Sequence, residues 1–115
     1  MCIRDSDMIV QGMGGLMSLT GHADQEPVRV GTSIGDITAG LFTTIGILSA
    51  LMERSKNHRG QMVDVSMLDC QIAILENAIA RFFATGESPP PSGARHPAIA
   101  PVSYTHLTLP TSDLV

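Results

Sequence analysis

Cysteine is scarce in this sequence, and Cys2 and Cys70 are the only two among its 115 residues. Neither has a partner at the spacing of a metal-binding motif, so we expect no metal site. We expect Cys70 to be a small core residue in a reducing compartment. Residues 1–6 also lack the apolar segment of a signal peptide, and the two observations together predict a cytoplasmic protein.

Basic residues are also few. Seven Lys and Arg against eleven Asp and Glu give a formal net charge of −4, which argues against a nucleic-acid-binding surface. The longest apolar run, residues 37–52, is interrupted by hydroxyl side chains. We judge it too short and too polar for a membrane span, so no membrane partner is expected. With 43% hydrophobic and 16% charged residues, the composition is that of a globular chain of at most one domain.

The sequence is organised around residues 31–40, where Asp36 is the only charged side chain. A long apolar helix is predicted over residues 34–54, and Ser33 and Asp36 have the spacing of a capping box at its start. A carboxylate in a first helical turn faces unpaired N–H groups and the positive end of the helix dipole. Such an oxygen can act as a nucleophile or base. The alternative is that Asp36 only caps the helix.

The remaining periodicity predicts an α/β layer fold with a parallel sheet, in the order β-α-α-β-α. We expect strands over residues 8–10 and 61–66, where apolar or alternating β-branched residues occur. Further helices are expected over residues 16–20 and from Ser66 to a stop at Gly86. Gly12 and Gly14 begin an incomplete GxGxxG pattern, which favours close backbone packing over phosphate binding.

Two strands are too few for a stable sheet of this kind, which favours a fragment of a larger domain. The ends, residues 1–6 and 102–115, resemble translated sequencing-adapter read-through. We therefore treat them as artefactual tails and exclude them from the fold. The part left for interpretation is residues 7–101, a partial domain.

Five blocks of this part resemble family III CoA-transferases, the group that contains formyl-CoA transferase and carnitine CoA-transferase. They occur in the family's order and cover nearly all of the trimmed chain. The blocks are DMIVQGMGGLMSLTG (residues 7–21), GDITAG (residues 35–40), IGILSAL (residues 45–51), RGQMVDVSMLD (residues 59–69) and RHPAIAP (residues 95–101).

The resemblance implies that Asp36 is the nucleophile of an enzyme that moves CoA from an acyl-CoA to a carboxylic acid. A covalent aspartyl intermediate would divide the exchange into easier steps. Met67 would line the acyl-CoA site, or would instead be core filler. CoA would be part of the substrate, with no permanently bound cofactor. The family's fold implies a Rossmann-like large domain and an interlocked homodimer.

Two alternatives stay open. An α-methylacyl-CoA racemase of the same fold would use a histidine in a Gly-His-Asp block, together with the matching aspartate, for proton transfer. Residues 7–11 occupy that region here and contain no histidine, and His22 lies beyond it. The second alternative is a truncated fragment that is itself inactive.

Overall fold

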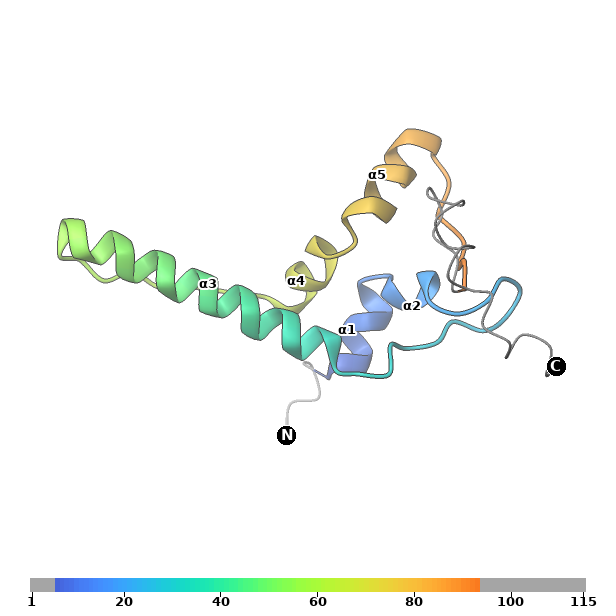
Figure 1. The fold of residues 1–115 in the computed structure, drawn as a ribbon, viewed down its shortest axis with the longest axis horizontal. Coiled ribbons are helices and arrows are strands. Elements are labelled where there is room, and N and C mark those ends of the chain that lie inside the picture. The colour runs from blue at the N-terminus through green and yellow to red at the C-terminus, as the bar shows by residue number, and fades with distance from the viewer. Residues whose placement is uncertain (1–5, 94–115) are drawn as a thin grey trace, which may run out of the picture.

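The computed structural model describes residues 6–93, which form five helices and no strand (Figure 1). Residues 1–5 and 94–115 lie outside this part, and with them Cys2, the block at residues 95–101 and nearly all of both expected tails. Ser6 is described, and it is the N-cap of the first helix. The helices are α1 (Asp7–Met13), α2 (Leu16–Leu19), α3 (Ile34–Asn57), α4 (Met67–Ala73) and α5 (Glu76–Thr85).

The strand predicted over residues 8–10 is wrong, because these residues belong to α1. The Ser6 hydroxyl accepts a hydrogen bond from the Ile9 N–H at 3.4 Å, and the Val10 N–H donates to the Ser6 carbonyl at 3.1 Å. An apolar run of three residues fits one turn of helix as well as it fits a short strand. The N-cap serine decides between them in favour of the helix.

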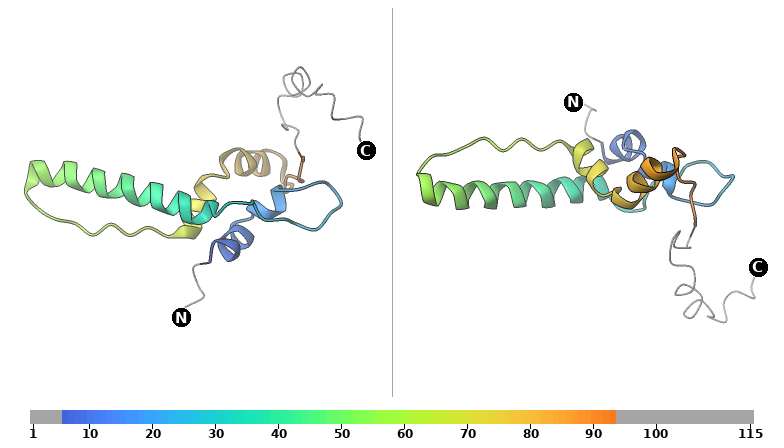
Figure 2. Two further views of the ribbon diagram at one scale, coloured as in Figure 1. Left: turned by 60° about the horizontal axis from the view of Figure 1, so that its bottom comes forward. Right: turned by 90° about the horizontal axis from the view of Figure 1, so that it is seen from above.

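The second predicted strand is extended but unpaired. Residues 58–66 run back along α3 (Figures 1 and 2), and the Val63 Cγ1 atom lies 2.7 Å from where a Cβ on Gly46 would be. Alternating β-branched residues favour the extended backbone, but a sheet requires a second strand to hydrogen-bond with. Within residues 6–93 there is none. The predicted α/β fold with a Rossmann-like parallel sheet is therefore wrong for this part of the chain.

The helix predictions fare better. The start of α3 at Ile34 and the short helix α2 are confirmed, and Gly86 ends α5 in the left-handed conformation, with φ 75°. The last helix, however, is not continuous. It breaks at Ile74 and Leu75 into α4 and α5, and the Leu75 N–H donates to the Ile72 carbonyl at 3.0 Å in place of a helical bond.

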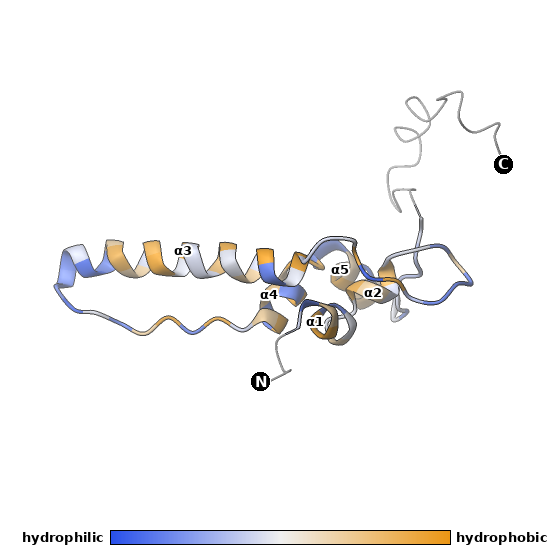
Figure 3. Ribbon diagram, turned by 90° about the horizontal axis from the view of Figure 1, so that it is seen from below, coloured by the Kyte–Doolittle hydropathy of each residue, from blue (hydrophilic) through white to orange (hydrophobic). Residues whose placement is uncertain are grey.

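Few apolar side chains are buried. Among the described residues the buried apolar core consists of Val10 and Cys70, each about 5% exposed, which confirms the expected burial of Cys70. Much of α3 is apolar and exposed, as the hydropathy colouring of Figure 3 shows. By length and composition alone α3 could cross a membrane, contrary to our estimate from its apolar run, but the core helix of a soluble protein satisfies the same criteria.

Candidate active site at the start of α3

The structure places Asp36 in the first turn of α3 with an exposed side chain. Ser33 is the N-cap residue, as predicted, but its hydroxyl makes no capping hydrogen bond, so the expected capping box does not form. No hydrogen bond of the Asp36 carboxylate occurs within residues 6–93. Asp36 thus makes no capping hydrogen bond in this part of the chain, although it stands as an acid in the first turn of α3.

The cap comes from a distant carboxylate instead. Oδ1 of Asp7, in the first turn of α1, accepts the Gly35 N–H at 2.7 Å, across 28 residues of chain. Its other oxygen, Oδ2, accepts from Gln11 Nε2 at 2.7 Å. Hydrogen bonds to an ionised carboxylate are stronger than those between neutral groups. Asp7 therefore fixes the backbone of the residue immediately before Asp36.

Gln11 extends this network to the chain that leads into α3. Its side chain is 0% exposed, and its Oε1 accepts the Val30 N–H at 2.8 Å. Its Nε2 also lies 3.4 Å from the Thr32 carbonyl. Sequence reasoning missed both Asp7 and Gln11 because it placed them in or beside a strand. In a helix, residues four apart share a face, and that spacing was the available signal.

Gly35 is also the meeting point of three helices. A Cβ at Gly35 would lie 3.1 Å from Asp7 Oδ1 and 3.5 Å from Oε1 of Gln71, which reaches it from α4. At Gly14, at the end of α1, a Cβ would lie only 2.6 Å from the Gln71 Cγ. Glycines at these two points therefore permit the close approach of α1, α3 and α4. The expectation that Gly14 serves backbone packing is confirmed.

Comparison with known proteins identifies the family of this chain. A profile of CoA-transferase family III matches residues 4–108. The chain belongs to CoA-transferase family III. It is 46% identical over 96 residues to acetyl-CoA:oxalate CoA-transferase of Acetobacter aceti, covering 83% of this chain and 25% of that protein. It is 36% identical over 107 residues to succinate–glutarate CoA-transferase of Agrobacterium fabrum, covering 93% and 26%.

A solved structure agrees with this family assignment. The crystal structure of a CAIB/BAIF family protein from Brucella suis superposes with a TM-score of 0.77 at 43% identity, covering 83% of this chain and 25% of that one. The chain thus spans about a quarter of the length of the relatives it matches. Membership of an enzyme family of CoA-transferases confirms the resemblance inferred from the sequence blocks.

Met67 is the first residue of α4 and is half-buried. It is the second residue that the resemblance assigned to the site. The hydroxyl of Ser66 caps α4 by accepting the Asp69 N–H at 3.3 Å. Helix α4 packs against α3, which carries Asp36. The role of Met67 stays a prediction.

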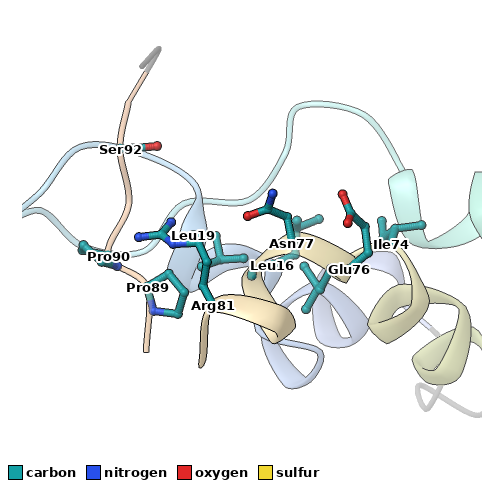
Figure 4. A pocket seen from close by; sticks show the side chains of 11 residues that line it. Leu16, Leu19, Ile74, Glu76, Asn77, Arg81, Pro89, Pro90 and Ser92 are labelled. Atoms are coloured by element: carbon teal, nitrogen blue, oxygen red, sulfur yellow. The ribbon is translucent and has the colours of Figure 1, made fainter. Parts of the chain in front are cut away.

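Within residues 6–93, three cavities of the molecule are lined by neither Asp36 nor Met67. The first, of about 290 Å³, lies between α2 and α5, with Leu16 and Leu19 facing Asn77 and Arg81 (Figure 4). The second, of about 300 Å³, shares Leu19 with it. The third, of about 340 Å³, borders Cys70, whose thiol pKa is raised by burial and by the charge of Asp69.

Proposed function

We propose that this chain carries the nucleophile of a longer enzyme that moves CoA from an acyl-CoA donor to a carboxylic acid through an aspartyl intermediate on Asp36. The observation that carries the proposal is that the Asp36 side chain in the first turn of α3 is exposed and makes no hydrogen bond within the described residues. Asp36 is exposed, and the Gly35 N–H is capped by Asp7 rather than by Asp36. Asp36 is thereby left available as a nucleophile, in a chain that belongs to CoA-transferase family III.

The proposed reaction begins when a carboxylate oxygen of Asp36 attacks the thioester carbonyl carbon. The C–S bond breaks, CoA leaves as a thiolate, and a mixed anhydride remains on Asp36. The thiolate then attacks the aspartyl carbonyl, which releases the donor acid and leaves an aspartyl-CoA thioester. An acceptor carboxylate reverses these two steps, so that a new acyl-CoA leaves and Asp36 is regenerated. The tetrahedral intermediates require hydrogen-bond donors for the oxyanion.

For the substrates we propose a chemical class rather than individual acids. The relatives are named for oxalate, mesaconate and glutarate, which are all dicarboxylic acids. We include in the proposal that the intact enzyme takes such acids as donor or acceptor, with CoA as part of the substrate and no permanently bound cofactor. We also include a homodimer in the cytoplasm that binds neither nucleic acid nor membrane, and contact of Met67 with the acyl-CoA.

Trapping the covalent intermediate tests the proposal. The intact enzyme, meaning the longer protein that contains this chain, is incubated with acyl-CoA and hydroxylamine, digested and mapped by mass spectrometry. We expect a hydroxamate on Asp36, and a loss of activity of at least about a thousandfold in Asp36→Ala. Asp69→Ala is the matched control, because Asp69 is an exposed acid in the first turn of α4. Full activity in Asp36→Ala, or modification at another residue, would show the proposal to be wrong.

Exchange without racemisation is a separate expectation. His22 is exposed in the connection before α3, and its Nδ1 lies 3.0 Å from where a Cβ on Gly93 would be. Residues 7–11, where a racemase would carry its histidine, instead provide the cap from Asp7. With a 2-methylacyl-CoA in deuterated water and no acceptor acid, we expect no deuterium at the α-carbon. Rapid uptake would favour the racemase.

A further inference from the structure

Gln71 is buried without any hydrogen bond. Its side chain is 0% exposed, and neither Oε1 nor Nε2 has a partner within residues 6–93. Gln11 is equally buried, yet both of its polar atoms are bonded. Leaving a buried donor or acceptor unpaired costs about 1–3 kcal/mol. An apolar side chain would be more favourable for stability at this position, so packing alone does not account for an amide.

The position of the amide indicates its role. The side chain of Gln71 leaves α4, passes over Gly14 and ends beside Gly35, where Oε1 is 3.5 Å from the position of a Gly35 Cβ. Asp7 Oδ1 is 3.1 Å from the same point. The oxygen and nitrogen of a glutamine amide are assigned only by the hydrogen bonds they make. Rotating the amide by 180° would place a donor on the side of Asp7.

We propose that Gln71 is a positioning residue for the proposed transferase reaction: its amide N–H donates to the Asp7 carboxylate, which holds the turn that carries Asp36. A carboxylate oxygen has two lone pairs, so Oδ1 can accept from both Gly35 and Gln71. This inference rests on the proposed function. Because Gln71 is fully buried, it acts through Asp7 and the backbone rather than on the substrate.

We call the pair of Asp7 and Gln71 the clamp on Gly35. Gly35 needs such a clamp because it is a glycine. A glycine has no Cβ and samples more backbone conformations than any other residue, and here it directly precedes the nucleophile. A misplacement of about 1 Å can reduce a rate about 100-fold. Asp7 and Gln71 approach Gly35 from two other helices and together would restrict its backbone.

The test compares Gln71→Met with wild type in the intact enzyme. Methionine keeps the length of the side chain and removes the amide. We expect acyl-enzyme formation in a single turnover to slow by about tenfold or more. The KM for acyl-CoA should change by less than about twofold, and Tm should change little, because removing the unpaired amide oxygen offsets the loss of the hydrogen bond to Asp7. Gln61→Met, at an exposed residue of the extended segment, is the matched control and should leave all three unchanged.

A double-variant cycle shows whether Gln71 acts through Asp7. If it does, Asp7→Asn combined with Gln71→Met should acylate no more slowly than Asp7→Asn alone. Fully multiplicative effects would overturn the proposal, and so would an unchanged acylation rate in Gln71→Met.

Hydrogen exchange of the Gly35 amide tests the clamp without measuring activity. The Gly35 amide should exchange faster in Gln71→Met than in wild type, and equal exchange would count against the clamp. If Asp36→Ala retains activity while exchange at Gly35 responds to Gln71→Met, the proposed function fails and the clamp stands. If Asp36→Ala is inactive while Gln71→Met matches wild type in rate and exchange, the function stands and the clamp fails.

Discussion

Asp36 and Asp69 each stand three residues after a serine N-cap, yet only one of the two serines caps its helix. Ser66 accepts the Asp69 N–H, whereas the Ser33 hydroxyl makes no capping bond at the start of α3. The Ser66 backbone is extended, with φ −92° and ψ 131°, whereas Ser33 has φ −76° and ψ 66°. At α3 the carboxylate of Asp7 accepts the Gly35 N–H at 2.7 Å instead. A local motif therefore predicts the position of a helix start without predicting which group satisfies it.

The carboxylate of Asp7 caps α3 from a distance, and its removal should destabilise the protein. Asp7→Ala in the intact enzyme should lower the free energy of unfolding by about 1–3 kcal/mol, because it leaves donors of Gly35 and Gln11 unpaired. Asp64→Ala is the control, since Asp64 is exposed and makes no hydrogen bond in the described structure. Urea unfolding measures both. Equal midpoints and slopes for Asp7→Ala and wild type would contradict the role of Asp7.

The thiol of Cys70 gives a second prediction. Burial, and secondarily the charge of Asp69, raises its pKa, so near pH 8 it holds less of the reactive thiolate than an ordinary cysteine. Iodoacetamide should label Cys70 slowly in the native intact enzyme and rapidly in urea. The native rate should rise with pH above the range where an ordinary cysteine has already ionised. Peptide mass spectrometry measures it, and equal native and unfolded rates would refute the prediction.

Among the elements, three helices meet where glycines allow a close approach. The side chain of Gln71 on α4 lies directly over Gly14 at the end of α1, and over Gly35 at the start of α3. The apolar pattern of residues 66–82 predicts one continuous helix, but the structure divides it into α4 and α5. Periodicity identifies the buried face of a helix, and it carries little information about a break in the backbone.

A pair of glycine substitutions tests this packing. In Gly14→Ala the new Cβ would lie 2.6 Å from the Gln71 Cγ and 3.0 Å from the Val10 carbonyl oxygen, so we expect a loss of about 1–3 kcal/mol in stability. Gly40→Ala in α3 has no atom within 4 Å of the new Cβ. It should be neutral or stabilising by up to about 1 kcal/mol. Thermal unfolding of the intact enzyme compares the two, and a Gly14→Ala variant as stable as Gly40→Ala would be inconsistent with the structure.

At the scale of the whole molecule, the described chain leaves most of its apolar surface in water. Val10 and Cys70 are its only buried apolar residues, and each contributes at most about 1.5–3 kcal/mol. Ordering one residue costs about 1–2 kcal/mol in backbone entropy. The exposed side of α3 is apolar along most of its length, including Leu41 at 60% exposure and Leu48 at 56%. The burial of two apolar side chains is far too small to offset the backbone entropy that is lost when the described residues are ordered.

We therefore predict that the 115-residue chain does not fold cooperatively by itself. Expressed alone, it should be insoluble, or should show helix by circular dichroism without a sharp thermal transition. The intact enzyme, measured in parallel, should unfold cooperatively because further chain would cover α3. A soluble 115-residue monomer with a two-state melt would disprove this prediction.

Several features of this chain follow from neighbouring residues alone. The helix starts after Ser33 and Ser66, the stop at Gly86, the burial of Cys70 and the family blocks around Asp36 could all be predicted, because their signals lie within one or two turns of the chain. A strand could not be settled this way: residues 61–66 are extended as predicted, but a sheet depends on a partner strand that the local pattern does not specify.

The candidate site is held by contacts between parts of the chain that are distant in the sequence. The cap of α3 comes from Asp7, 28 residues before Gly35, and the amide of Gln71 reaches the same glycine from a third helix. Neither pairing leaves a periodic or spacing signal, since the partners are brought together by the packing of α1, α3 and α4. Asp36 can be found from its own neighbours, whereas the geometry around it depends on side chains that are distant in the sequence and meet only in the folded chain.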